Sequence, residues 1–128
     1  MRLLLDTHAF LWFVTNDPQL SETALEVIAE PTNSILLSPA SYWEIAIKVS
    51  LGKYPLTVPF ETFFQEGIEG SDVMIVPIEV RHAAVLSALP MHHKDPFDRM
   101  IVSQAIAERI PIVSVDSVLD AYGIQRLW

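Results

Sequence analysis

The chain contains no cysteine, and this absence excludes disulfide bonds, thiolate zinc sites and cysteine nucleophiles. It also lacks any apolar stretch that approaches the ~20 residues of a membrane-spanning helix. The apolar N-terminal run reaches Asp6 too soon to form the hydrophobic region of a signal peptide. No internal repeat or low-complexity tract occurs. We therefore expect a cytoplasmic protein that makes no membrane contact.

Basic residues are scarce: 8 lysines and arginines stand against 16 aspartates and glutamates, which gives a net charge of −8. Such a balance argues against a general nucleic-acid binder, because nonspecific affinity for phosphate chains depends on cations. The argument fails if several acids are gathered at one point to hold divalent cations, which reverse the local field. Taken alone, the charge is most simply explained by a soluble surface, and a basic protein partner is a further explanation.

At 128 residues the chain is long enough for one domain, residues 1–128, with a single core. Short apolar runs of the kind found in buried strands alternate with segments of helical periodicity. The expected strands are residues 2–5, 35–37, 73–76 and 110–115, with an alternating edge strand at 124–128. This order predicts a three-layer α/β/α sandwich around a central, mainly parallel sheet of four to five strands.

Residues 92–102 carry the clearest local signal. Asp95 is placed to cap a helix whose first position is Pro96, where the missing N–H costs nothing. Asp98 then lies in the first turn, where the helix dipole favours a negative charge. The residues between Ser21 and Pro31 and those from Ser38 onward show similar helix starts, and residues 54–68 read as a helical excursion outside the sheet.

Four acids can meet only at the edge of the sheet formed by the carboxyl ends of the strands. Asp6 and Asp116 follow predicted strands, whereas Glu44 and Asp98 lie near helix starts. Each also has a simpler explanation: Asp6 as a helix cap, Asp98 as a first-turn acid and Asp116 as a turn former. For Glu44 the simpler explanation is an ion pair with Lys48 one turn away.

Converging carboxylates repel one another, and their pKa values rise unless a counter-charge is present. A divalent cation removes this conflict. An all-oxygen ligand set without cysteine or a compact histidine triad favours Mg²⁺ or Mn²⁺ over Zn²⁺. Because Mg²⁺ keeps waters and accepts phosphate oxygens, such a site suits phosphodiester hydrolysis by a metal-activated water.

Four motifs along the chain support this interpretation. They are Leu4-Leu5-Asp6-Thr7-His8, Ser41-Tyr42-Trp43-Glu44-Ile45, Asp95-Pro96-Phe97-Asp98-Arg99-Met100-Ile101 with Gln104-Ala105, and Val113-Ser114-Val115-Asp116. In order and spacing the set resembles the PIN-domain ribonucleases, and in detail the VapC toxins of prokaryotic type II toxin–antitoxin pairs. The resemblance covers nearly the whole chain.

The resemblance implies an endoribonuclease that uses one or two Mg²⁺ or Mn²⁺ ions per site. It places Asp6, Glu44, Asp98 and Asp116 in the acidic quartet as catalytic and metal-binding residues. It further implies an RNA substrate, a homodimer, and a cognate antitoxin that inhibits the toxin in a hetero-oligomer.

Other polar residues of the motifs have two open roles each. Thr7 and Ser114 either orient a carboxylate or water, or cap the local backbone. Asp95 is either a helix cap or a group of the metal site. Arg99 either contacts RNA phosphate or balances the charge of neighbouring acids, as does Lys94.

Histidines 92 and 93 lie in a loop before a helix, where exposure to solvent or a backbone hydrogen bond is more common than a role as metal ligand or general acid. Two other functions compete with the nuclease. A haloacid-dehalogenase-like phosphatase also starts from an aspartate after the first strand, but it needs a second acid where this chain has His8. The second competing function is that of a catalytically silent PIN-like module that sequesters a basic antitoxin.

Overall fold

A computed structural model describes all residues from Met1 to Trp128. Its centre is a five-stranded sheet in the order β3-β2-β1-β4-β5, in which every neighbouring pair is parallel. The strands are β1 (Arg2–Leu5), β2 (Ser34–Leu37), β3 (Met74–Ile75), β4 (Ile112–Val113) and β5 (Arg126–Leu127). The expected parallel α/β architecture is confirmed.

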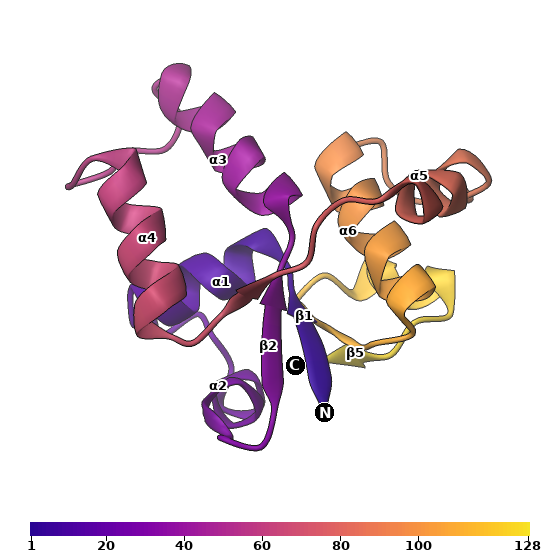
Figure 1. Cartoon of the computed structure of the whole chain (residues 1–128), viewed down its shortest axis with the longest axis horizontal. Helices are drawn as coiled ribbons and strands as arrows, with labels where there is room; N and C mark the ends of the chain where they lie inside the picture. Colours follow the sequence, from indigo (N-terminus) through magenta and orange to yellow (C-terminus); the bar gives the residue numbers. More distant parts are fainter.

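Helices cover both faces of the sheet (Figure 1). They are α1 (Thr7–Val14), α2 (Glu22–Ala29), α3 (Pro39–Ser50), α4 (Phe60–Gly70), α5 (Val80–Ser87), α6 (Pro96–Glu108) and the 3₁₀ helix η1 (Ser117–Tyr122). In the view of Figure 1, α1, α2 and α4 lie on one side of the sheet, and α5 and α6 lie on the other. None of these helices is both long and apolar enough to cross a membrane.

Side chains along β1 alternate between the two faces of the sheet, and this alternation divides the core into two layers. Leu3 and Leu5 of β1 point into a cluster with Phe10 of α1 and Phe64 of α4. Leu4, between them, points to the opposite cluster. The second cluster includes Ile101, Val102 and Ala105 of α6. Each β1 side chain from residue 3 to 5 is fully buried, which explains why this strand reads as a continuous apolar run.

Predicted helix starts are confirmed at three places. The Ser21 hydroxyl accepts a hydrogen bond from the Ala24 N–H, and the Ser38 hydroxyl accepts one from the Ala40 N–H. Asp95 caps α6, which begins at Pro96 as expected. These caps satisfy N–H groups that have no partner inside a helix.

Three strands are shorter than the sequence suggests. β3, β4 and β5 each contain two residues, although we expected strands over 73–76, 110–115 and 124–128. Backbone hydrogen bonds continue beyond the assigned ends, from Leu4 N–H to the Pro111 carbonyl and from Val76 N–H to the Leu37 carbonyl. The apolar runs therefore mark the buried segments correctly but overstate the length of regular pairing.

The excursion at residues 54–68 contributes to the core. Phe64 is 5% exposed, and Tyr54, Phe60 and Phe63 pack against the same cluster. Phe64 contacts the rings of Phe10 and Phe60, with centroid separations of 5.7 and 4.7 Å. Core packing therefore accounts for these aromatic side chains.

Candidate acidic site at the carboxyl ends of the strands

The strand order reverses direction between β1 and β4. From β1 the chain proceeds outward to β2 and β3 and then returns to place β4 on the other side of β1. In parallel sheets, ligands bind at such a switch point, beyond the carboxyl ends of the strands. Asp6 follows β1, and Ser114 and Asp116 follow β4, so both predicted strand-end acids lie at this position.

Asp6 caps helix α1. Its Oδ1 atom accepts a hydrogen bond of 2.8 Å from the Ala9 N–H, and its own N–H donates to the Val113 carbonyl at 3.2 Å. Burial raises the pKa of Asp6, and the charge of Asp116 adds to this effect, whereas the Ser114 hydroxyl and Ala9 N–H oppose it. Asp6 therefore caps α1, as predicted, and also lies at the end of β1, next to the other strand-end acid, Asp116.

Glu44 points inward from α3, with 6% of the residue exposed. The Thr7 hydroxyl lies 2.9 Å from Glu44 Oε1 and 3.0 Å from the Ser41 hydroxyl. Because a hydroxyl has one proton and a carboxylate only accepts, Thr7 donates to Glu44. Lys48 donates to the other oxygen at 2.9 Å, so the ion pair considered above is also present. Thr7 therefore orients a carboxylate, which is one of the two roles considered for it above, the other being a cap of the local backbone.

Asp98 lies in the first turn of α6, next to its cap. Asp95 Oδ1 accepts hydrogen bonds from the N–H groups of Phe97 and Asp98 at 2.8 and 3.1 Å, and its side chain is exposed. Burial raises the pKa of Asp98 to about 6, and the charges of Asp95, Glu44 and Asp6 contribute. Asp95, Glu44 and Asp6 are therefore near enough to Asp98 to disfavour its ionisation.

Asp116 caps η1 through a 3.0 Å hydrogen bond from the Val118 N–H to Oδ1. Its own N–H donates to the buried Ser114 hydroxyl at 3.0 Å, so Ser114 shapes the local turn. The second oxygen, Oδ2, lies 2.7 Å from His93 Nε2. The side chain of His93 is only 10% exposed.

The position of His93 corrects the sequence-based interpretation. We expected an exposed or backbone-bonded side chain, yet both ring nitrogens have side-chain partners, Asp116 and Tyr122. The only signal in the sequence is that His93 precedes Asp95 by two residues. His92, its neighbour, is exposed as expected.

Arg99 also differs from expectation. Its guanidinium forms no ion pair with Asp95 or Asp98; instead it is buried and donates to backbone carbonyls. The carbonyls are those of Leu86, Leu89, Pro90 and His93, at 3.5, 3.2, 2.9 and 3.5 Å. Arg99 thus ties the end of α5 and the following loop to α6. Lys94 remains exposed.

The carboxylates fit a hard divalent cation by their chemistry, because all four acids supply oxygen ligands. Burial, with a smaller contribution from neighbouring acids, raises the pKa values of Asp6 and Asp98. Their side chains do not form a finished coordination sphere. No three histidine, aspartate or glutamate side chains lie close enough together to hold one ion. Asp6, Glu44, Asp98 and Asp116 are the residues that could hold Mg²⁺ or Mn²⁺.

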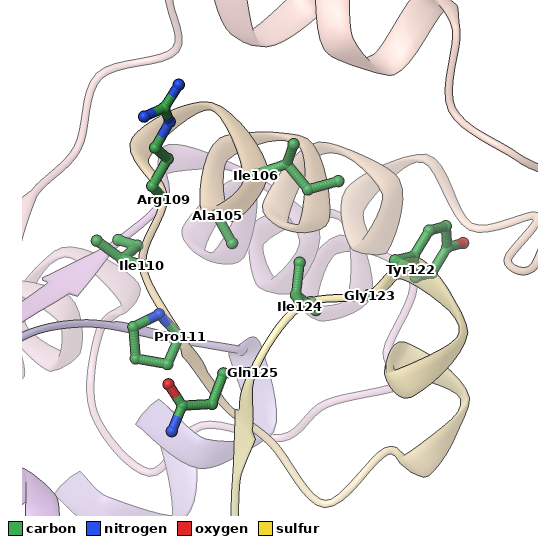
Figure 2. Close-up of a pocket in the computed structure, with 9 residues that line it drawn as sticks. All are labelled: Ala105, Ile106, Arg109, Ile110, Pro111, Tyr122, Gly123, Ile124 and Gln125. Atoms are coloured by element: carbon green, nitrogen blue, oxygen red, sulfur yellow. The ribbon is translucent and has the colours of Figure 1, made fainter.

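A pocket of about 320 Å³ with a mixed polar and apolar lining lies elsewhere, between the second half of α6 and the segment that joins η1 to β5 (Figure 2). Ala105, Ile106 and Ile124 line it. Ile110 and Pro111, at its edge, precede β4 and therefore lie at the opposite end of this strand from Asp116. The pocket contains none of the four acids.

A pH dependence of stability follows from Asp98. Its pKa in the folded protein, about 6, exceeds the ordinary value of 3.8. The unfolded chain binds this proton less tightly, so the free energy of unfolding falls as pH rises between these values and is constant above them. We expect Asp98→Asn to raise the free energy of unfolding of the metal-free protein at about pH 7.5 by about 1 kcal/mol, after allowance for solvent screening.

Urea denaturation in metal-free buffer at about pH 4 and about pH 7.5 measures this effect, which should be much smaller at the lower pH. Asp72→Asn is the matched control, because Asp72 is exposed, lies before β3 at the other end of the sheet, and has a positive φ of 52° that asparagine tolerates. Equal stability of the Asp98→Asn variant and the native protein at both pH values would contradict the prediction.

Three comparisons relate the chain to known proteins. The family model described as the PIN domain matches residues 3–125. No curated protein sequence matches the chain. The structure is similar to VapBC2 from Rickettsia felis bound to a DNA fragment from its promoter, with a TM-score of 0.74, 17% identity, and coverage of 98% of this chain and 97% of that chain.

Two further solved structures share this fold. VapBC-1 from nontypeable Haemophilus influenzae has a TM-score of 0.64 and 16% identity, over 98% of this chain and 96% of that chain. FitAcB from Neisseria gonorrhoeae has a TM-score of 0.63 and 17% identity, over 97% and 95%. Because the family model matches nearly the full length and the fold agrees, the chain belongs to the PIN domain family.

Proposed function

We propose that this protein is a metal-dependent endoribonuclease, the toxin of a type II toxin–antitoxin pair. The proposal is supported by the positions of Asp6 and Asp116 after β1 and β4, at the switch point of a PIN-domain sheet, and by the effect of Glu44 and Asp6 on the pKa of Asp98. The pKa of Asp98, raised to about 6 by burial and by its acidic neighbours, supports a shared site. A solvent-facing, purely capping role for Asp98 would not produce this shift.

In the proposed mechanism, Asp6, Glu44, Asp98 and Asp116 hold one or two Mg²⁺ or Mn²⁺ ions. When bound, the metal supplies an activated water and offsets charge that develops on the phosphate oxygens. Thr7 and Lys48 orient Glu44 by donating to its two oxygens. The carboxylates accept the proton that the attacking water releases, and no side chain forms a covalent intermediate.

RNA cleavage by purified, antitoxin-free protein tests the proposal. We expect cleavage in Mg²⁺ or Mn²⁺, loss of cleavage in excess EDTA, and recovery when Mn²⁺ is restored. RNA affinity should rise with Mg²⁺, since the acidic edge repels phosphate until metal binds, and fall with monovalent salt. Cleavage that persists in EDTA would overturn the metal-dependent mechanism.

A catalytically silent binding module is the alternative. The structures similar to this chain are VapBC and FitAcB assemblies, and we propose by analogy that a cognate antitoxin binds here. In the alternative, the protein binds this antitoxin tightly but cleaves no RNA in any divalent metal. The same purified protein, assayed for both properties, separates the two functions.

We further propose a homodimer that uses the exposed face of α3 and Leu51, the residue that follows the helix. Trp43, Ile47 and Leu51 are 60%, 38% and 62% exposed and recur at four-residue spacing, so they form one apolar stripe. We expect Leu51→Glu to shift the native protein from dimer to monomer, because dimerisation would bury the new charge. Multi-angle light scattering measures the mass.

Val80→Glu is the control for this substitution, since Val80 is 87% exposed on α5, away from the stripe. It should leave the mass unchanged. A monomeric native protein, or a Leu51→Glu variant that remains dimeric, would show that the α3 stripe does not mediate dimerisation.

A further inference from the structure

His93 lies outside the acidic quartet, yet it makes a short side-chain contact with one of its members. We propose that His93 is a positioning residue, which fixes the Asp116 carboxylate at the acidic edge and thereby strengthens divalent-metal binding. The proposal rests on the metal-dependent function proposed above. It assigns to His93 a hydrogen-bond donor role and no ligand or proton-transfer role.

The hydrogen-bond pattern defines what each ring nitrogen does. Nε2 lies 2.7 Å from Asp116 Oδ2, and because an ionised carboxylate only accepts, Nε2 carries a proton and donates. Nδ1 lies 2.9 Å from the Tyr122 hydroxyl. The rings of His93 and Tyr122 also stack, with centroids 5.5 Å apart and planes inclined by 15°. Two hydrogen bonds and a stacked ring therefore hold the imidazole in one orientation.

The partners of His93 come from distant parts of the chain. Asp116 and Tyr122 lie at the two ends of η1, whereas His93 lies in the loop that leads to Asp95 and Asp98. The backbone carbonyl of His93 also faces the buried Arg99 guanidinium at 3.5 Å. His93 thus connects η1, which Asp116 caps, to the loop that precedes α6. Thr7 similarly connects the segments that carry Asp6 and Glu44.

This contact determines the orientation of Asp116. The Val118 N–H holds Oδ1 at 3.0 Å and His93 holds Oδ2, so both oxygens are restrained although the side chain is 38% exposed. Each carboxylate oxygen has two lone-pair directions, and one on each remains available for a cation. Outer hydrogen-bond partners of this kind typically change metal affinity about 10- to 100-fold when removed.

Mn²⁺ binding to the metal-free protein, without RNA, tests the proposal by electron paramagnetic resonance of the unbound ion. We expect His93→Phe, which keeps an aromatic ring against Tyr122 but cannot donate to Asp116, to weaken Mn²⁺ binding about 10- to 100-fold. His93→Gln can present an amide N–H near the position of Nε2 and should restore affinity to within about 3-fold of the native protein.

His92→Phe is the matched control. His92 lies in the same loop and packs its ring edge-on against Tyr122, with centroids 4.9 Å apart, but forms no hydrogen bond to an acid. It should bind Mn²⁺ as the native protein does. Thermal unfolding of each metal-free variant separates a positioning role from a structural one. If His93 only stabilised the fold, His93→Phe would lower the melting temperature, and His93→Gln would not restore Mn²⁺ affinity.

The outcomes distinguish the two proposals. Native-like Mn²⁺ affinity in His93→Phe, or equal losses in His93→Phe and His93→Gln, would overturn the positioning role and leave the nuclease proposal intact. A native protein that binds no Mn²⁺ and cleaves no RNA would overturn the proposed function, and the role of His93 with it.

Discussion

Replacement of Asp98 by asparagine is expected to lower the rate of RNA cleavage by at least about 100-fold, since loss of even an outer partner of a metal ligand costs about 10- to 100-fold. The amide retains the shape of the carboxylate but removes the negative charge. In the metal-free protein this charge is unfavourable, because burial and the neighbouring acids raise the pKa of Asp98 to about 6. A group that destabilises the fold and is needed for activity is typical of a functional site.

The experiment compares single-turnover cleavage by Asp98→Asn and Asp6→Asn with that by the native protein at saturating Mn²⁺. Both variants should be folded and inactive, and Asp98→Asn should be the more stable protein at neutral pH. Asp72→Asn, at the opposite edge of the sheet, should cleave at the native rate. Full activity in both Asp6→Asn and Asp98→Asn would reject the assignment of the acidic site.

Arg99→Met is expected to lower the free energy of unfolding by roughly 3 kcal/mol, the largest loss of stability predicted here. Methionine fills most of the volume of the side chain but donates no hydrogen bond. The carbonyls of Pro90 and Leu89, which accept from the guanidinium at 2.9 and 3.2 Å, would lose their partner. The loop that carries His93 would also lose its attachment to α6.

Chemical denaturation of the metal-free protein measures this loss, with Lys94→Met as the control. Lys94 is a cation of the same loop but is exposed, so its replacement should change stability by less than about 0.5 kcal/mol. Comparable stability of Arg99→Met and Lys94→Met would show that the carbonyl contacts contribute little. That result would also favour the other role considered for Arg99, a contact with RNA phosphate.

Local chemistry explains why much of the fold could be predicted. The cap at Asp95 and the proline at position 96 act within one helical turn, so the start of α6 can be predicted from adjacent residues. Buried parallel strands read as apolar runs because both of their faces are covered, as β1 and β2 are. The ends of β3 and β4 could not be predicted, since the extent of pairing depends on neighbouring strands.

The acidic site also has one part that could be predicted from the sequence and one part that could not. The acids could be placed at one edge because Asp6 and Asp116 follow parallel strands, whose carboxyl ends share that edge. The partners of Arg99 could not be predicted, because its side chain can turn toward the nearby acids or toward the carbonyls at the end of α5. Only the packing of α5 against α6 decides between them.

The sequence alone determined the order of strands and helices, the helix caps and the acids that follow the strands, because these depend on residues within one turn or one strand. The tertiary structure decided which side chains meet across the switch point: Thr7 with Glu44, and His93 with Asp116. These pairs join segments that are 37 and 23 residues apart. Such contacts depend on how α3, α6 and η1 pack on the sheet, and no local pattern contains that information.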